Sequence, residues 1–182
     1  FLTLFTYLGI PFFFDYKNNQ SDLEKKIFEN FDLNLSFTSK VKYNIFPSPR
    51  LNLKNVKILG FSESSKNIGS VKKVILKIPF KRLVSLKKLD FDSIELIDAV
   101  INIKTSEINN FKNYLNNKAH EKPIQLTKSK INLLDKTKLL FNIDIKKLRI
   151  SGKRLFNKLD LKGRIFDTKI KINYQNKNCN KN

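Results

Sequence analysis

The chain has 182 residues, of which 36 are Lys or Arg and 16 are Asp or Glu, so its formal charge is +20. This length is typical of one domain with a substantial core. One Cys and one His exclude an intramolecular disulfide, a thiol-bound metal cluster and most His-dependent catalysis. Cys179 lies in a polar tail and His120 in a polar linker, so we expect no metal and no cofactor.

The basic residues are spread along the whole chain, and the sequence pI is near 10.0. Clustered Lys and Arg are typical of nucleic-acid-binding proteins, because they neutralise phosphates. The even spread, with abundant Lys, Asn, Ile and Phe and no Trp, instead indicates the composition of an AT-rich genome. We interpret the charge as a solvated face that also favours anionic lipid headgroups, and we expect no nucleic-acid partner. The absence of Met predicts that the sequence is a piece of a longer protein.

Residues 1–16 are mostly apolar and carry no charge before Asp15. A helix that spans a bilayer needs about 17–25 residues, so this run is too short by itself. We interpret residues 1–16 as a truncated membrane anchor, the outer part of a transmembrane helix whose beginning is missing. A signal-peptide core and a buried helix are the alternatives.

A short amphipathic helix is predicted next, at the start of a first β segment over residues 17–115. Ser21 and Glu24 have the spacing of a capping box, in which each side chain bonds the backbone amide of the other residue. We expect the apolar stripe of this helix to cover one end of a sheet. The stripe consists of Leu23, Ile27, Phe28 and Phe31.

Apolar and polar residues alternate with a period of two from Leu33 onward, which predicts strands. Residues 33–37 and 41–45 are predicted to pair as a hairpin. A change of phase at Asn55 predicts a bulge or a tight bend between residues 51–53 and 56–58.

The alternation is clearest over residues 74–115, where one face is apolar and the other carries Lys, Asp and Asn. This central stretch predicts three strands, a basic link and a helix. Their ranges are a strand at 74–78, the link at 79–88, strands at 91–96 and 100–104, and the helix at 106–115.

The polar linker at residues 116–127 is the best internal boundary of the chain. Residues 128–175 predict a continuing antiparallel β segment, and residues 176–182 form a polar tail. The expected fold is mainly β (α+β): an elongated, curved antiparallel sheet that forms a groove, with the anchor helix and one or two short amphipathic helices. Because few helices are available to cover so many strands, the apolar face either closes or stays partly open.

The sequence lacks the motifs of nucleotide-binding proteins, zinc enzymes and serine hydrolases. Four carboxylates cluster in the central stretch, but they fall at predicted turns and strand ends or beside Lys. We therefore predict no catalytic residue and no enzyme activity. The four are Asp90, Asp92, Glu95 and Asp98.

Two groups of residues follow an order known from one protein family. A Pro-containing segment precedes a leucine-x-leucine-x-x-valine strand, matched by Pro47, Pro49, Leu51, Leu53 and Val56. A leucine-rich link then leads into strands and an Asn-containing helix start, matched by Leu83, Leu86, Ile94, Leu96, Ile101, Ile103, Asn110 and Leu115. This order resembles the N-terminal region of the AsmA family of envelope proteins over most of residues 33–174. The glycine and tryptophan often found around that Asn are replaced here by Asn109 and Phe111.

The resemblance implies a protein anchored in the bacterial inner membrane, with its bulk in the periplasm. Its β-groove would carry lipid acyl chains for phospholipid transport and outer-membrane biogenesis. Phospholipids and the membrane are the expected partners, and other envelope proteins are further candidates. The expected groove-lining residues are Leu33, Leu35, Phe37, Leu51, Leu53, Leu76, Ile78, Ile94, Leu96, Ile101, Ile103, Phe141, Ile143 and Ile145.

Two other functions remain open from the sequence. A structural or assembly scaffold of the cell envelope would use the same sheet with a closed core. A basic nucleic-acid-binding domain would bind strands in a strongly salt-dependent way. Whether the apolar face is packed or open separates lipid transport from the scaffold.

Overall fold

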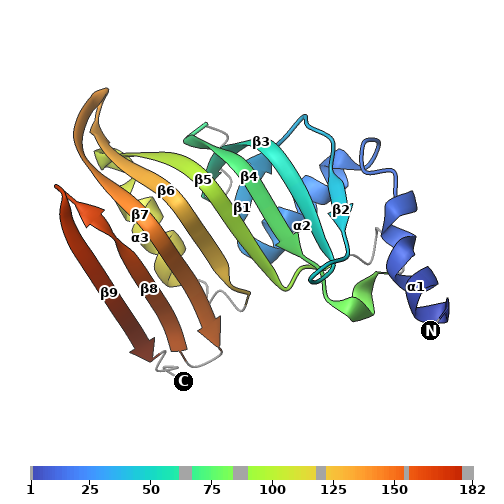
Figure 1. The fold of residues 1–182 in the computed structure, drawn as a ribbon. Helices are drawn as coiled ribbons and strands as arrows, with labels where there is room; N and C mark the ends of the chain where they lie inside the picture. Colours follow the sequence, from blue (N-terminus) through green and yellow to red (C-terminus); the bar gives the residue numbers. More distant parts are fainter. Residues whose placement is uncertain (1, 62–66, 84–89, 118–121, 154–155, 178–182) are drawn as a thin grey trace, which may run out of the picture.

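The computed structural model describes residues 2–61, 67–83, 90–117, 122–153 and 156–177 (Figure 1). These residues form a mainly β fold, as predicted, with one open nine-stranded sheet. The strand order is β1-β3-β4-β5-β6-β7-β8-β9, and β2 lies beside β3. The strands are β1 (Leu33–Ser36), β2 (Lys42–Asn44), β3 (Arg50–Phe61), β4 (Gly69–Lys77), β5 (Ser93–Lys104), β6 (Ile124–Asp135), β7 (Lys138–Lys153), β8 (Phe156–Ile165) and β9 (Thr168–Lys177).

The helices within the described residues are short, and α2 and α3 lie behind the sheet in the view of Figure 1. The predicted stripe of α2 is largely confirmed, because Leu23, Ile27 and Phe31 are its buried residues. The helices are α1 (Leu2–Gly9), η1 (Ile10–Phe13), α2 (Gln20–Phe31), η2 (Phe80–Arg82), η4 (Thr105–Glu107) and α3 (Ile108–Asn117).

The ladder between β5 and β6 is parallel, with Leu96 opposite Leu126. From β5 the chain passes through η4 and α3 and returns to the same end of the sheet, where β6 begins at Ile124 inside the predicted linker. Parallel neighbours need such a crossover, whereas alternation in the sequence reports only which face a side chain takes. The prediction of a purely antiparallel sheet is therefore wrong, and the sheet is mixed and mostly antiparallel.

The predicted hairpin between residues 33–37 and 41–45 does not form. Instead, β1 pairs with one end of β3, where Leu35 lies opposite Ile58, and β2 pairs with the other end. With 12 residues, β3 is long enough for two short strands to lie along the same edge. The alternation identified the strands correctly, but their partner is a longer strand elsewhere in the chain.

The strands predicted at 91–96 and 100–104 are a single strand, β5, which the left-handed backbone of Asp98 (φ 53°) interrupts. A bulge inserts one residue into one strand of a ladder. At the predicted change of phase Asn55 of β3 has a left-handed backbone (φ 51°), but Lys54 lies opposite Lys73 and Val56 opposite Val71, so the register between β3 and β4 is the same on both sides and no residue is inserted.

Interruptions of the strand pairing lie side by side on neighbouring strands. Lys128 of β6 also has a left-handed backbone (φ 51°), and the ladder between β7 and β8 shifts between Ile145 and Lys147. The paired residues on either side of these positions keep the same register from β3 to β7. We call this line of interrupted pairing the crease, because it crosses β3 to β7 at the same level of the sheet.

The capping box predicted at Ser21 does not form. The N-cap of α2 is Asn19, which makes no side-chain capping hydrogen bond. The Glu24 carboxylate instead accepts hydrogen bonds from the Gln20 side-chain amide (2.9 Å) and the Phe37 backbone amide (3.1 Å). Glu24 thus joins α2 to the segment that follows β1.

The helix predicted at 106–115 is present, as η4 followed by α3. Among its apolar residues, Ile108 is exposed, Phe111 is half-buried and Tyr114 is buried. The side chain of Leu115 lies outside the described residues.

The N-terminal helices pack against the edge of the sheet near β2. The Tyr7 hydroxyl donates to the Phe80 carbonyl oxygen (2.7 Å), and the Tyr43 hydroxyl donates to the Leu8 carbonyl oxygen (3.1 Å). In the part of the chain that the structure describes, no helix has the length and apolar character that a bilayer crossing requires.

Candidate functional site

The apolar face of the sheet is built from rows of side chains that cross the strands. Residues directly opposite each other on neighbouring strands point to the same face. The first apolar row takes one residue from each of β3 to β9: Leu53, Val74, Leu96, Leu126, Leu148, Leu161 and Ile172. The second apolar row lies next to it: Leu51, Leu76, Ile94, Ile124, Ile150, Leu159 and Tyr174.

The exposed fraction of the side chains rises along the first apolar row. It is 0% at Leu53, 5% at Leu126 and 9% at Leu161, and it reaches 44% at Ile172. The second apolar row ends in the same way, with Tyr174 at 53%. In the view of Figure 1 α3 lies behind β6 and β7, and β9 extends beyond it. One face of the sheet is therefore a closed core at β3 and an open apolar surface at β9.

Further side chains of β7, β8 and β9 enlarge this open surface. Ile143 lies opposite Ile165, and Ile170 lies opposite Gly163, which leaves space beside it. All three isoleucines are half-buried. We call the set the open apolar end; it consists of Phe141, Ile143, Ile165, Ile170, Ile172 and Tyr174.

The predicted groove-lining residues fall into two groups. Phe141 and Ile143 belong to the open apolar end. The others are at most 5% exposed and form the core: Leu33, Leu35, Phe37, Leu51, Leu53, Leu76, Ile78, Ile94, Leu96, Ile101, Ile103 and Ile145.

Sequence reasoning missed the other members of the open apolar end, above all Ile172 and Tyr174. Their alternation places them in a strand, and this is the signal that the sequence carries. It does not say which strands extend beyond the helices, because that depends on how far α3 reaches along the sheet.

The four clustered carboxylates do not form a paired-carboxylate site. Asp90 forms an ion pair with Lys122, and the Glu95 carboxylate accepts a hydrogen bond from the Thr127 hydroxyl (2.8 Å). These two carboxylates thus have separate partners. The remaining two, Asp92 and Asp98, are exposed.

No metal centre is found among the described residues, where no three His, Cys, Asp or Glu side chains are grouped to hold an ion. His120 and Cys179 lie outside the described residues.

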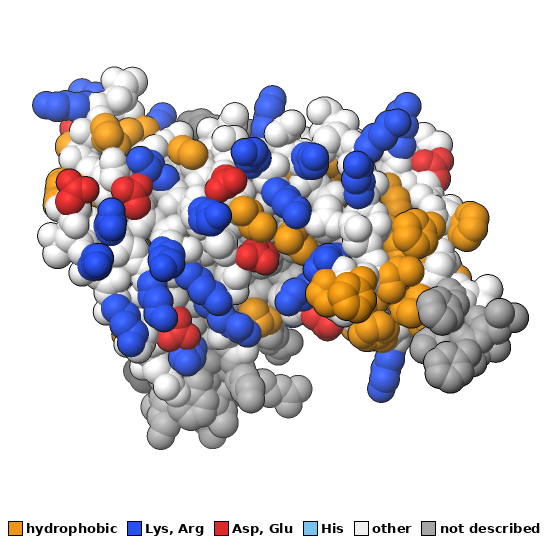
Figure 2. All heavy atoms as spheres, viewed as in Figure 1, with side chains coloured by type: hydrophobic (Ala, Val, Ile, Leu, Met, Phe, Trp, Pro, Cys, Tyr) orange, Lys and Arg blue, Asp and Glu red, His pale blue; other side chains and the backbone are white. Residues whose placement is uncertain are grey.

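A second exposed apolar surface, which we call the aromatic patch, surrounds η1 and η2. It is made of Phe12, Phe13, Phe46 and Phe80, which are between 53% and 89% exposed. The Phe12 ring meets the Tyr43 ring edge-on, with their centroids 4.9 Å apart. Figure 2 shows apolar side chains gathered at this end of the molecule, beside α1.

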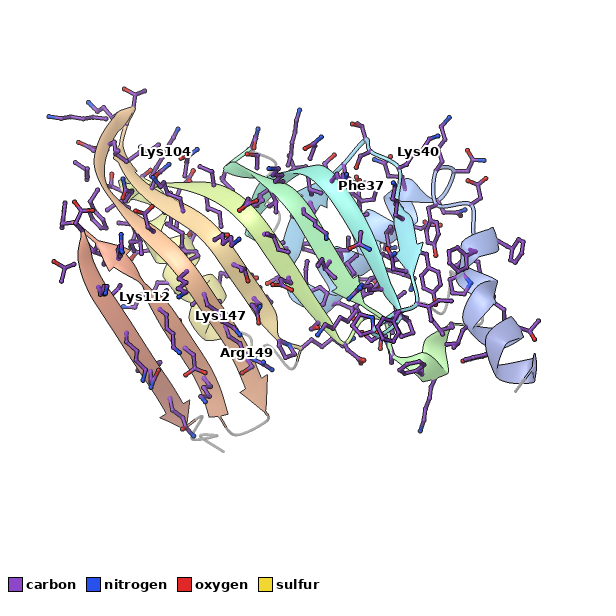
Figure 3. The ribbon with its side chains drawn as sticks, in the orientation of Figure 1. Phe37, Lys40, Lys104, Lys112, Lys147 and Arg149 are labelled. Carbon is purple, nitrogen blue, oxygen red and sulfur yellow. The ribbon has the colours of Figure 1, made fainter. Side chains whose placement is uncertain are left out.

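The face of the sheet opposite the core is rich in Lys and Arg (Figure 2). Lys147 and Arg149 of β7 belong to it (Figure 3), and both are exposed. The sheet therefore separates an apolar face, partly covered by helices, from a basic face.

No family model matches this chain, and the comparison with curated proteins finds no match. The resemblance to the AsmA family stays a prediction, and the function rests on the chain's own residues.

Proposed function

We propose that this chain is part of a membrane-anchored envelope protein that holds lipid acyl chains on the open apolar end of its sheet. It would reside at the bacterial inner membrane, with its bulk in the periplasm, and serve phospholipid transport and outer-membrane assembly. The observation that carries the proposal is the rise in exposure along the first apolar row, from Leu53 to Ile172.

The open apolar end has the chemistry of an acyl-chain surface. It combines aliphatic and aromatic side chains on adjacent strands, and it continues a core that is already apolar. Moving acyl carbons from water onto such a surface is favourable by about 0.8 kcal/mol for each fully buried CH₂. Chains lying along the rows would complete the burial that the helices provide for β3 to β5.

The aromatic patch supports attachment to a membrane at the other end of the molecule. Aromatic side chains concentrate at the interface between headgroups and hydrocarbon. The patch includes Phe12 and Phe13 of the apolar segment that we interpret as the anchor, and Lys42 and Lys81, near its other members in sequence, are exposed. These cations suit an anionic headgroup layer.

The test places a charge on the acyl-chain surface. Ile172→Asp puts a carboxylate at the open apolar end, whereas Asn173→Asp puts it on the same strand but on the opposite face. Both residues are exposed, so both variants are expected to fold. Transfer of a fluorescent phospholipid between vesicles should fall about tenfold or more in Ile172→Asp, because an acyl chain must then cover a charge.

The control Asn173→Asp should transfer lipid at the unaltered rate. Phospholipid extracted from the purified chain and identified by mass spectrometry should decrease in Ile172→Asp alone. Equal transfer by both variants, or a purified chain without lipid, would count against the proposal.

A scaffold of the cell envelope is the second candidate function. Dense packing of the core beneath α2 and α3 favours it, because most predicted lining residues are inaccessible there. A scaffold predicts that Ile172→Asp weakens the capture of a partner envelope protein and leaves lipid content unchanged.

A further inference from the structure

The crease forms a groove on the basic face, opposite the core. The groove has a volume of about 1070 Å³ and crosses β5 to β9. Four strand spacings of about 4.8 Å give it a length of about 19 Å. It therefore exceeds the size of a single ion and suits a ligand with several charged groups.

The walls of the groove follow directly from the strand register. One wall is the row Val100, Lys130, Asp144, Arg164 and Lys169, whose members lie opposite one another on β5 to β9. The other wall contains the opposed pair Lys162 and Lys171. Between the walls lie the residues at the crease, Asp98, Lys128 and Lys146.

The groove is strongly cationic. It is lined by seven cationic side chains and two carboxylates, a formal excess of five positive charges. Within it, Lys130 forms an ion pair with Asp144 (3.3 Å), and both side chains remain about half exposed. The other carboxylate, Asp98, stands at the end of the groove on β5.

Like charges stand directly opposite each other in this part of the sheet. Lys162 lies between Lys147 and Lys171, and Arg164 lies opposite Lys169. Such cross-strand pairs of like charge are destabilising. A bound anion would remove this repulsion and would gain charge-assisted hydrogen bonds to the same side chains.

The side chains that line the groove also indicate which class of anion it suits. No aromatic side chain is among the described residues that line the groove, so it lacks the stacking platform of single-stranded nucleic-acid sites. Ammonium and guanidinium groups at close spacing suit phosphate oxygens.

We propose that the groove along the crease binds phosphate groups, carried by a lipid headgroup or by a free phosphate ester. Lys162, Arg164 and Lys171 hold the anion from adjacent strands, and Asp144 restrains Lys130. This site lies on the opposite face from the open apolar end, so it does not depend on acyl-chain binding.

The test compares two triple variants of the full chain that lose the same charge. Lys162→Gln/Arg164→Gln/Lys171→Gln removes three cations from the groove. Lys54→Gln/Lys57→Gln/Lys77→Gln removes three exposed cations from the same face on β3 and β4. Calorimetric titration with inorganic pyrophosphate should show affinity reduced about tenfold or more in the groove variant and less than about twofold in the control variant.

Asp144→Asn gives a result in the opposite direction. It keeps the side-chain shape, releases Lys130 and removes a negative charge, so pyrophosphate affinity should rise about two- to fivefold. Circular dichroism and thermal unfolding of each variant establish that the fold is intact. A lower affinity of Asp144→Asn for pyrophosphate would contradict the assignment of the groove.

Sedimentation with vesicles distinguishes the two sources of phosphate. If the unaltered chain binds vesicles of phosphatidylcholine with phosphatidylglycerol and the groove variant does not, the phosphate belongs to a lipid headgroup. Pyrophosphate binding without vesicle binding identifies a free phosphate ester. Equal losses in both triple variants, or tighter binding of a single-stranded oligonucleotide than of either probe, would overturn the proposal.

Discussion

The Tyr114 hydroxyl donates a 3.0 Å hydrogen bond to the backbone carbonyl oxygen of Phe31. This bond joins α3 to the last residue of α2 across 83 positions of the chain, and both residues are buried. It ties together the two helices that cover the closed part of the apolar face.

Tyr114→Phe should lower the free energy of unfolding by about 1–3 kcal/mol. The substitution leaves the Phe31 carbonyl oxygen buried without this donor, and a buried unsatisfied group costs about that much. Urea denaturation followed by circular dichroism measures the change. Tyr174→Phe, on the exposed end of the second apolar row, should change stability by less than about 0.5 kcal/mol. Equal effects would show that the bond contributes nothing.

Stability should fall as the pH rises above about 10. Burial raises the pKa of the Tyr114 hydroxyl, and the Asp32 carboxylate raises it further; burial also raises the pKa of Tyr16. In the unfolded chain a Tyr has a pKa of about 10, so above that pH the unfolded state binds fewer protons than the folded state. The unfolding free energy then decreases with increasing pH.

Denaturation midpoints measured from neutral to alkaline pH, with tyrosinate absorbance as a second readout, test this dependence. Burial also raises the pKa of the Tyr43 hydroxyl, and Tyr114→Phe removes one of these three hydroxyls, so the stability of the variant should decline less steeply. A slope identical to that of the unaltered chain would contradict a raised pKa at Tyr114.

Shortening the side chains of the first apolar row should lower the free energy of unfolding by unequal amounts. Leu96→Ala removes a buried side chain and should destabilise the chain by about 2–5 kcal/mol, through lost burial and the cavity left behind. Ile172→Ala, at the open end, should cost less than about 1 kcal/mol. Chemical denaturation of both variants measures the difference. Similar costs would mean that β9 is covered as fully as β5.

Gly69→Ala should destabilise the chain by about 1–3 kcal/mol. A Cβ at Gly69 would overlap the carbonyl oxygen of Val100 on the adjacent strand β5. Gly9→Ala is the matched control, because a Cβ there meets nothing within 4 Å. At the end of α1 the control should be neutral or slightly stabilising. Thermal unfolding compares the two variants directly. A Gly69→Ala variant as stable as the unaltered chain would contradict the close approach of Gly69 to the Val100 carbonyl oxygen.

Much of the fold could be predicted because it depends on local pattern. The alternation from Leu33 onward identified the strands, and the change of phase at Asn55 identified the position at which the backbone of β3 is left-handed. The pairing partners of the strands were harder to predict. The hairpin between residues 33–37 and 41–45 was a reasonable choice for two short neighbours, but nothing in their sequences reveals that β3 offers each a longer partner.

The candidate site was less predictable than the fold. Alternation assigns Leu96 and Ile172 to the same kind of position, yet one is buried and the other is exposed. The difference comes from where α2 and α3 lie, which is a property of the assembled chain. The basic groove could not be predicted for a related reason, because Lys128 and Lys171 are far apart in sequence and line the same groove only when β6 to β9 are assembled.

The succession of β6 to β9 has a consequence for the length of the apolar surface. Each of β7, β8 and β9 pairs antiparallel with the edge of the strand before it, and each contributes one residue to each row. A strand that pairs with the outer edge of β9, whether it comes from this protein or from another, would lengthen both rows by about 4.8 Å. The sheet thus grows by repetition, and the length of its apolar surface scales with the number of strands that are added.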